Sequence, residues 1–422
     1  MALAQSLGMP AYIYENHYSK NDPEKIRYRV EFEPLKELVD KIVCQKKVNH
    51  YIPSSPVLPT AQVKVREVST IDYSGFSYDV ETESDHFEVS GIYSHNCRSG
   101  LSPWKDENGN YKFYGRFNKG VVTINLVDVA LSSQKDTAKF WKIFDERLEL
   151  CYKALLCRYE RLKGTPSDVA PILWQHGAIA RLEKGEPIDK YLTGGYSTIS
   201  LGYAGLWECV YYMTGSKLTE EVGRNFGLEV MQHMNKKCDE WNERCNLGFG
   251  IYGTPLESTV YKFAKCLQNR FGTIQGVTDK NYITNSYHTH VTESIDAFSK
   301  LHAESAFQSL STGGAISYVE VPNLTNNIDA VLMIMKYIYE NIMYAELNTK
   351  SDYCQVCGFD GEIQIVEDDN KKLIWKCPNC GNTDENKLNV ARRTCGYIGS
   401  NFWNQGRTQE IKERVVHLGD NE

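Results

Sequence analysis

Residues 115–126 read GRFNKGVVTINL, and the apolar, β-branched end of this stretch predicts a buried strand. Apolar residues at helical spacing follow it: Phe140, Trp141, Phe144, Leu148, Leu155 and Leu156. The same order recurs with strand patterns at 248–252 and 315–319, which precede helix patterns opening at Pro255 and Ile328. Strands that alternate with helices predict a parallel α/β architecture, open or barrel-like.

The composition is that of a folded protein. The chain has 422 residues, 41% of them hydrophobic and 24% charged, with a net charge of −7. At roughly 100–200 residues per domain, this length corresponds to about two to four domains. No apolar run reaches the roughly 18–20 residues of a membrane span, no signal-peptide profile opens the sequence, and no basic excess favours nucleic acid. These features predict a cytoplasmic globular protein without a membrane or stable nucleic-acid partner.

Two CxxC pairs stand out among thirteen cysteines, an odd number that indicates a reducing compartment when no signal peptide is present. The pairs consist of Cys354, Cys357, Cys377 and Cys380. Two such turns can complete a tetrahedral four-sulfur site, and Gly358 and Gly381 after them let the backbone fold around sulfur. We interpret the group as a structural zinc site that folds the tail. A redox dithiol and an iron–sulfur cluster are the alternatives.

Residues 392–399, RRTCGYIG, would ordinarily be a glycine-containing turn. The stretch resembles the glycyl-radical motif of the anaerobic (class III) ribonucleoside-triphosphate reductases, and the four-cysteine module before it is similar to that family's C-terminus. A radical at a Cα atom is stabilised by the flanking amide and carbonyl groups, and only a residue without Cβ can flatten there. The resemblance implies that Gly396 carries this radical.

The resemblance extends over residues 97–422. The stretch that begins at Cys97, together with GRFNKGVVTINL, resembles the family's active-site cysteine loop. It implies that Cys97 becomes the thiyl radical that abstracts the ribose 3′-hydrogen, and that Asn118 hydrogen-bonds the ribose. A thiol suits this step because S–H and glycyl C–H bonds have similar strengths, so hydrogen atoms pass between them reversibly. A buried packing cysteine is the alternative for Cys97.

Two further pairs of residues have more than one interpretation. Thr254 and Ser258 surround the start of a helix after a strand, where free backbone N–H groups hold the substrate's phosphates or where a plain N-cap forms. His288 and His290 have the spacing of a metal pair, but we expect hydrogen-bonded histidines in a strand or loop.

Residues 76–96 resemble the C-terminal splicing blocks of an intein, a segment that excises itself from a protein. Cys97 would accept the upstream acyl group, and Asn96 would cyclise onto its own carbonyl and cut the chain. His95 would polarise that carbonyl or protonate the leaving group. The assisting positions of the upstream block are occupied by Asp79 and His86.

The two resemblances divide the chain into five parts. Residues 1–55 are the remnant of an intein insert or linker, which resembles the end of a LAGLIDADG homing endonuclease, and 56–96 are a β-rich splicing segment. Residues 97–350 form the C-terminal half of a glycyl-radical-type α/β barrel. A zinc ribbon follows at 351–385, and the radical loop occupies 386–422.

This arrangement implies a partner. The chain begins with Met1 and Ala2, where an intein begins with a nucleophile, usually Cys or Ser, and the reductase's N-terminal half is not included. The expected partner is that half carrying an intein N-part, joined by splicing at Asn96/Cys97. An inactive, interrupted fragment is the alternative.

The family implies further cofactors and partners. The substrates are ribonucleoside triphosphates, and a radical-SAM activase, which uses S-adenosylmethionine and an iron–sulfur cluster, installs the radical. The assembled enzyme would be an anaerobic homodimer, with formate or a thiol protein as the reductant. A different glycyl-radical enzyme, such as a formate-lyase or dehydratase, is the competing prediction, although those enzymes generally lack a four-cysteine module.

Overall fold

The computed structural model describes residues 11–16, 27–32, 86–89, 92–95, 100–101, 116–254, 256, 258–324, 327–350, 352–393, 398–399 and 403–418. For the four segments before residue 96 and for 398–399, the backbone alone is described. The chain divides into two compact units, Met1–Asn96 and Cys97–Glu422. Their boundary falls at the position where the sequence predicts splicing.

The described part of the first unit consists of two antiparallel hairpins. Strand β1 (Ala11–Asn16) pairs with β2 (Arg27–Phe32), and β3 (His86–Val89) pairs with β4 (Ile92–His95). In the second hairpin, His86 is the direct partner of His95. Two of the predicted splicing residues are therefore brought together at the level of the backbone.

Parallel strands form the framework of the second unit. Strands β5 (Phe117–Asn125), β6 (Ser197–Ala204) and β7 (Phe249–Tyr252) make one parallel sheet in that order, and β8 (Ser317–Glu320) is parallel to β9 (Ala345–Asn348). The Gly313 N–H donates to the Ile251 carbonyl at 2.7 Å, which pairs the segment before β8 with β7. The predicted parallel α/β architecture is confirmed. The described strands do not close into a barrel.

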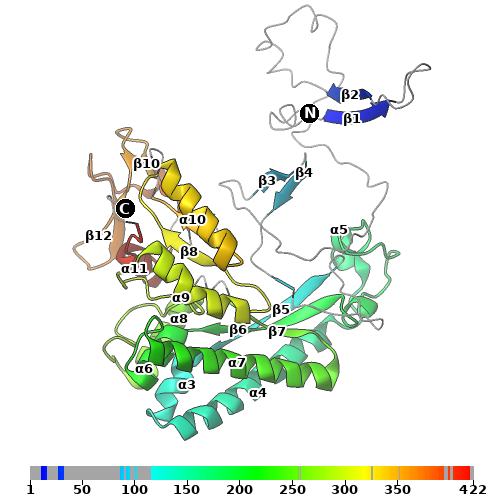
Figure 1. The fold of residues 1–422 in the computed structure, drawn as a ribbon, viewed down its shortest axis with the longest axis horizontal. Helices are drawn as coiled ribbons and strands as arrows, with labels where there is room; N and C mark the ends of the chain where they lie inside the picture. The colour runs from blue at the N-terminus through cyan, green and yellow to red at the C-terminus, as the bar shows by residue number, and fades with distance from the viewer. Residues whose placement is uncertain are drawn as a thin grey trace, which may run out of the picture. The chain divides into compact units, whose positions relative to one another are not determined.

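The helices of the described residues surround these strands (Figure 1). In chain order they are α3 (Leu126–Ser133), α4 (Thr137–Leu162), α5 (Pro171–Trp174), α6 (Leu206–Thr214), α7 (Glu221–Cys245), α8 (Thr259–Phe271), α9 (Ala297–Leu310), α10 (Ile328–Asn341) and α11 (Gln405–Glu413), with 3₁₀ turns η2 (Ser167–Val169), η3 (Asp189–Tyr191) and η4 (Glu385–Lys387). None of them is long and apolar enough to cross a membrane.

The chain leaves β5 through a side-chain cap. The Asn125 side chain accepts hydrogen bonds from the Val127 and Asp128 amides, which satisfies donors at the start of α3. Gln134 ends α3 in the left-handed conformation, and the Asp136 side chain caps α4. The structure therefore places the short helix α3 between the predicted strand and the predicted long helix α4.

A second boundary also differs from the sequence prediction. Helix α8 begins at Thr259 and not at Pro255. The Leu256 carbonyl, which could have started the helical ladder, instead accepts a hydrogen bond from Arg407 Nη2 at 2.9 Å. A contact across 151 residues thus delays the helix.

The main core lies between the three-stranded sheet and the helices α4, α6 and α7. Every residue of β6 is buried, as expected for a central parallel strand covered on both faces. Phe140 and Phe144 of α4 and Trp241 of α7 are fully or almost fully buried against it. Figure 1 shows α4 and α7 running together along β5, β6 and β7.

A second core joins β8 and β9 to α9 and α10. Ile334 of α10 and Leu301 of α9 are fully buried with Val319 of β8. The C-terminal tail follows, built from short antiparallel strands: β10 (Asp352–Cys354), β11 (Asp360–Gly361), β12 (Gln364–Glu367), β13 (Leu373–Lys376), β14 (Leu388–Asn389), β15 (Arg392–Arg393) and β16 (Ile398–Gly399).

Candidate active site and metal centre

Asn118 lies near the start of β5, where its side-chain amide is held on both sides. Its Nδ2 donates to Ser200 Oγ at 2.6 Å and to Thr198 Oγ1 at 3.2 Å, both on β6. Its Oδ1 accepts the Gly120 N–H at 2.7 Å. Both amide hydrogens are therefore used, and the remaining lone pair of Oδ1 is the group that Asn118 can offer to another molecule.

The neighbouring residue holds the strand itself in place. Lys119 is buried, and its Nζ donates to the carbonyls of Leu192 at 2.9 Å and Leu247 at 3.0 Å. Burial lowers the pKa of Lys119 to about 8. The ammonium group thus ties β5 to the loops before β6 and β7, directly beside Asn118.

A second group of hydroxyls lies further along the same strands. Thr254, after β7, is buried, and its Oγ1 lies 3.4 Å from Thr123 Oγ1 of β5. Gly202 of β6 lies between them, because a Cβ atom there would come within 2.0 Å of Thr254 Oγ1. The sheet therefore carries a row of neutral polar side chains from Asn118 to Thr254.

The segment that follows Cys97 approaches this row. A Cβ atom at Gly100 would lie 3.1 Å from Gly314 Cα, and one at Gly313 would lie 3.4 Å from Ser200 Oγ. Ser200 in turn binds Asn118. The backbone three residues after Cys97 thus reaches the Asn118 site through Gly313 and Gly314, whereas Cys97 itself lies outside the described residues.

The structure tests the alternative interpretations of Ser258 and of the two histidines. Ser258 precedes α8 but makes no side-chain cap, so the plain N-cap interpretation is wrong for it. His288 Nε2 lies 2.6 Å from the Ile316 carbonyl, and His290 Nδ1 lies 2.8 Å from Thr292 Oγ1. The expected hydrogen-bonded histidines are confirmed, and burial lowers the pKa of His290 to about 4.

The four paired cysteines gather in the tail. Their sulfur atoms all lie within 4.8 Å of one another, with 3.7 Å separating the Cys354 and Cys380 sulfurs and 3.7 Å separating those of Cys357 and Cys377. Zinc–sulfur bonds of about 2.3 Å in a tetrahedron separate the sulfurs by about 3.8 Å, so the residues fit zinc. A hydrogen bond from the Asn379 side chain lowers the pKa of Cys357 to about 6, toward the thiolate that metals bind.

Both cysteine turns have the same backbone geometry. Gly358 and Gly381 adopt φ values of +72° and +73°, which residues with a Cβ rarely adopt. Each donates its N–H at 2.9 Å to the carbonyl of the first cysteine of its pair. The expectation that these glycines let the chain turn around sulfur is confirmed.

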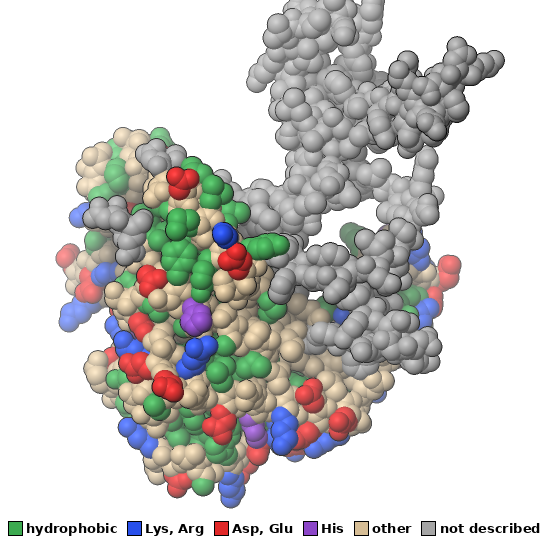
Figure 2. All heavy atoms as spheres, in the orientation of Figure 1, with side chains coloured by type: hydrophobic (Ala, Val, Ile, Leu, Met, Phe, Trp, Pro, Cys, Tyr) green, Lys and Arg blue, Asp and Glu red, His purple; other side chains and the backbone are tan. Residues whose placement is uncertain are grey.

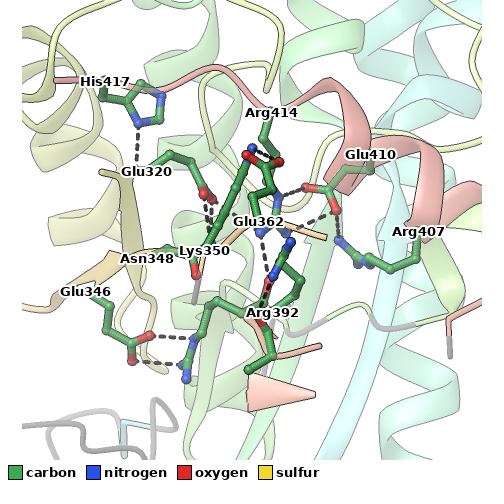
Figure 3. A network of polar contacts seen from close by, with 12 residues as sticks. Glu320, Glu346, Asn348, Lys350, Glu362, Arg392, Arg407, Glu410, Arg414 and His417 are labelled. Carbon is green, nitrogen blue, oxygen red and sulfur yellow. Dashed lines mark hydrogen bonds and ion pairs between the residues drawn. The ribbon is translucent and has the colours of Figure 1, made fainter. Parts of the chain in front are cut away.

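Buried ion pairs hold the tail together and connect it to β8 and β9 (Figure 3). Arg392 forms a two-pronged pair with Asp352 of β10, and its guanidinium lies over the Trp375 ring. Arg393 Nε lies 2.5 Å from Glu346 Oε2 of β9. These two arginines directly precede residues 394–397, which include Gly396 and lie outside the described residues.

The chain after this loop is fixed to the same framework. Arg414 Nη1 donates to the Arg393 carbonyl at 2.8 Å and lies 3.2 Å from Glu320 Oε1 of β8. Glu410 of α11 pairs with both Arg414 and Arg407. Figure 3 shows these charges facing one another between α11 and the strands. Both ends of the segment that carries Gly396 are therefore held close to β8 and β9.

A sequence model of the anaerobic ribonucleoside-triphosphate reductase family matches residues 54–417. The chain belongs to this family. The match begins at residue 54 and includes the whole of the segment 56–96 assigned to splicing, and no intein is shown there.

Two named relatives illustrate the similarity. The chain is 38% identical over 330 residues to the anaerobic ribonucleoside-triphosphate reductase of Escherichia coli (strain K12), which covers 77% of this chain and 46% of that protein. It is 40% identical over 329 residues to the reductase of Enterobacteria phage T4, covering 76% and 52%. The chain thus spans about half the length of the curated relatives it matches.

Solved structures of the same family share the fold. The anaerobic ribonucleotide reductase from Thermotoga maritima with glycerol in the active site aligns with a TM-score of 0.50 and 20% identity over 75% of this chain and 46% of that one. A second anaerobic ribonucleotide reductase aligns with a TM-score of 0.54 and 20% identity, covering 75% and 47%.

Sequence reasoning missed several residues around the candidate reductase site. Thr198 and Ser200 alternate along β6, which is a sign that they share one face of the strand, but their partner lies 80 or more residues away. Glu320, Glu346 and Asp352 are ordinary acidic residues in the sequence. Only the arrival of arginines from the tail shows that they anchor it.

Proposed function

We propose that the chain is the C-terminal part of an anaerobic ribonucleoside-triphosphate reductase, which converts ribonucleoside triphosphates to deoxyribonucleotides. The observation that carries this proposal is a series of close contacts that leads from Gly100 through Gly313 and Ser200 to Asn118. It brings the segment after the candidate radical cysteine to an asparagine with one hydrogen-bond acceptor to offer. A ribose hydroxyl is a suitable donor for that acceptor.

In this proposal Gly396 stores the radical and Cys97 uses it. The Cys97 thiol gives its hydrogen atom to the glycyl Cα, which restores glycine and leaves a thiyl radical. The thiyl radical then takes the 3′-hydrogen of the ribose, and Asn118 Oδ1 accepts a hydrogen bond from a ribose hydroxyl. The ion pairs of Arg393 and Arg414 hold these two residues, which lie before and after Gly396 in the sequence, close to β9 and β8.

Thr254 and Ser258 are proposed to bind the substrate's phosphates. Thr254 ends the hydroxyl row on the sheet, and Ser258 precedes α8 without capping it. The first N–H groups of α8 are then free to donate to phosphate oxygens, with help from the positive end of the helix dipole.

Zinc is proposed as the resident metal of the four cysteines. It would supply the crosslink that folds the tail, because four protein thiolates leave no open position for catalysis. The cluster is compact and half-buried, with Cys354 and Cys377 on its inner side. Zinc content would also separate this protein from other glycyl-radical enzymes.

Splicing at Asn96/Cys97 is proposed for the first unit. The boundary between the two compact units and the pairing of His86 with His95 support it. Asn96 would cyclise, His95 would assist the cleavage, Asp79 and His86 would support the upstream step, and Cys97 would receive the acyl group. The remaining half of the reductase would then be joined through a peptide bond to Cys97.

The assembled enzyme is proposed to be a cytoplasmic homodimer that a radical-SAM activase charges under anaerobic conditions. An inactive, interrupted fragment is the second candidate, because the chain covers about half of its relatives.

Two experiments test the proposal. Peptide mass spectrometry across Cys97 in the native source should find a foreign sequence joined directly to Cys97-Arg98, and peptides running unbroken through His95-Asn96-Cys97 alone would favour the fragment. After anaerobic activation, the electron paramagnetic resonance doublet of a glycyl radical should vanish in Gly396→Ala and persist in Gly399→Ala. A doublet that survives in Gly396→Ala would refute the assignment.

A further inference from the structure

A small cavity lies between the C-terminal tail and the strands and helices that hold it. Its lining comes from residues 282–291, from α9, from β8, from α11 and from His417. The cavity has a volume of about 50 Å³. One water-sized atom needs about 10–15 Å³ by the same measure, so the cavity holds a ligand of about three to five non-hydrogen atoms.

Asn285 lines this cavity with an amide group that the protein leaves unsatisfied. The side chain is only 8% exposed, and neither its Nδ2 nor its Oδ1 has a hydrogen-bond partner among the described residues. Buried amide groups in folded proteins are nearly always hydrogen-bonded. An unpartnered amide on a polar cavity therefore indicates a ligand.

Two further side chains of the lining offer N–H groups. The Glu320 amide donates to His417 Nδ1 at 2.8 Å (Figure 3), and burial lowers the pKa of His417 to about 3, so the neutral ring carries its hydrogen on Nε2. Nε2 has no hydrogen-bond partner in the described part of the chain. Lys300 is buried, and its Nζ donates to a single described acceptor, Glu304 Oε1 at 2.5 Å, which lies outside the lining. The lining thus offers more unpartnered N–H groups than acceptors.

The charged residues of the lining favour an anion. Three cations face two carboxylates there: Lys300, Arg407 and Arg414 against Glu320 and Glu410. The chain as a whole has a net charge of −7, and on the face shown in Figure 2 acidic and basic side chains are interspersed. The excess of cations is therefore a local property of the cavity. A carboxylate matches it, because a carboxylate is negative and only accepts hydrogen bonds.

The cavity is separate from the site around Asn118. Asn118 pairs with Thr198 near the start of β6, whereas Asn285 forms a bridge with Ala204, the last residue of that strand. At about 3.3 Å per residue, the strand between these two points spans about 20 Å. None of the described residues proposed to bind the substrate lines the cavity.

We propose that this cavity is a binding site for a small monovalent carboxylate. Its oxygens accept hydrogen bonds from Asn285 Nδ2, His417 Nε2 and Lys300 Nζ. Asn285 and Lys300 belong to the framework, whereas His417 belongs to the tail. The bound carboxylate therefore joins the two and acts as an effector that holds the tail in place. Binding requires neither radical chemistry nor splicing, so its test is independent of the proposed function.

Saturation-transfer NMR of the full chain with acetate, at an ionic strength held constant with chloride, tests the proposal. Acetate fits the cavity in size and should bind saturably with a dissociation constant of about the millimolar range, as expected for so small a ligand. Nitrate, a planar anion of similar size, should compete with acetate. Acetamide, which has the shape of acetate without its charge, and benzoate, which is too large, should not compete.

Substitutions at Asn285 locate the binding site. Asn285→Asp places a second negative charge in the cavity and should weaken acetate binding at least about tenfold. Asn285→Leu removes the N–H groups at nearly constant size and should weaken it about threefold or more. Neither variant breaks an existing side-chain hydrogen bond, and thermal melts check that both fold. Asn341→Asp makes the same change of charge at an exposed asparagine of α10 and should bind acetate like wild type.

Amide hydrogen exchange tests the link to the tail. Acetate should slow exchange in α11 and at His417 in wild type, but not in Asn285→Asp. The proposal would be overturned by a wild-type chain that does not bind acetate below about 20 mM, by acetate binding that Asn285→Asp leaves intact, or by equal binding of benzoate. Acetate binding without slower exchange in α11 would overturn the role of the carboxylate in holding the tail.

Discussion

Two buried glutamates, one beside the sheet and one in the tail, have pKa values shifted in opposite directions. Glu208 of α6 is fully buried, and burial raises its pKa to about 7. For Glu410 of α11, burial alone would raise the pKa, but Arg414 and Arg407 lower it to about 2. Glu208 accepts hydrogen bonds from the Thr284 amide and hydroxyl, whereas Glu410 is paired with full positive charges.

The difference reflects how each region is stabilised. At the sheet, Asn118, Ser200 and Thr198 are uncharged and share hydrogen bonds between adjacent strands. The tail has a smaller apolar core than the sheet region, and it combines this core with a four-cysteine cluster and buried ion pairs. Four predictions test this contrast, from the largest expected effect to the smallest.

Loss of the four-sulfur site should have the largest effect. Cys377→Ser should remove the zinc and unfold the tail while leaving the sheet region folded, because metal binding to such a site supplies about 10 kcal/mol or more of folding free energy. Metal analysis and amide hydrogen exchange would measure both consequences. Cys266→Ser, at an exposed cysteine of α8, is the control and should retain the zinc. A folded tail without metal would contradict the prediction.

Breaking the buried pair of Arg392 should have the next largest effect. Arg392→Ala leaves Asp352 buried without its cation, which should lower the free energy of unfolding by about 3–5 kcal/mol. Lys163→Ala removes an exposed pair with Glu160, which solvent screens, and should change the free energy of unfolding far less. Urea unfolding compares the two, and equal losses would show that the Arg392 pair contributes no more than a surface pair.

Replacing Glu208 or Glu410 by glutamine should change the stability of the protein in opposite directions. The folded pKa of Glu208 is raised from 4.5, so its ionisation lowers stability progressively as the pH rises from about 4.5 to about 7. Glu208→Gln should therefore stabilise the protein above pH 7, by up to about 3 kcal/mol, and flatten this part of the pH profile.

Glu410→Gln provides the opposite case. The pKa of Glu410 is depressed, so its contribution is present above about pH 4.5 and disappears as the pH falls toward about 2. Glu410→Gln should destabilise the protein at neutral pH. Thermal melts between pH 3 and pH 8 would measure both variants, and a shift of the same sign in both at pH 8 would contradict the comparison.

The smallest effect on stability should come from the uncharged hydrogen bonds that hold Asn118. Ser200→Ala removes the 2.6 Å bond to Asn118 and should lower the free energy of unfolding by about 1 kcal/mol, with a smaller loss for Thr198→Ala, whose bond is 3.2 Å. Ser309→Ala, which loses an exposed bond to the Ala306 carbonyl, is the control. A larger loss for Thr198→Ala than for Ser200→Ala would show that Asn118 is held differently.

Much of the fold could be predicted from local patterns. The strands at 121–125, 249–252 and 317–319 and the helix beginning at Ile328 appear where hydrophobic periodicity indicates them. The starts of α3 and α8 were less predictable, because the cap of Asn125 and the contact of Leu256 with Arg407 determine where the helices begin. Hydrophobic periodicity gives no information about such contacts.

For the candidate site, too, the local motifs could be predicted from the sequence and the long-range partners could not. The cysteine spacing predicted a cluster that the structure brings together, because each CxxC turn is local and the two turns need to meet only once. The resemblance named Asn118, Thr254 and Gly396, but it did not reveal Ser200, Thr198 or the arginine partners in β8, β9 and β10.

The sequence by itself determined the parallel α/β class, the cluster of four cysteines and the family resemblance, because these depend on residues that are close together in the chain or on motifs. Tertiary structure alone decided that Ser200 orients Asn118 and that Glu346 and Asp352 receive Arg393 and Arg392. These features arise when segments 40 to 94 residues apart meet in a low-dielectric interior, where a buried charge must find its partner.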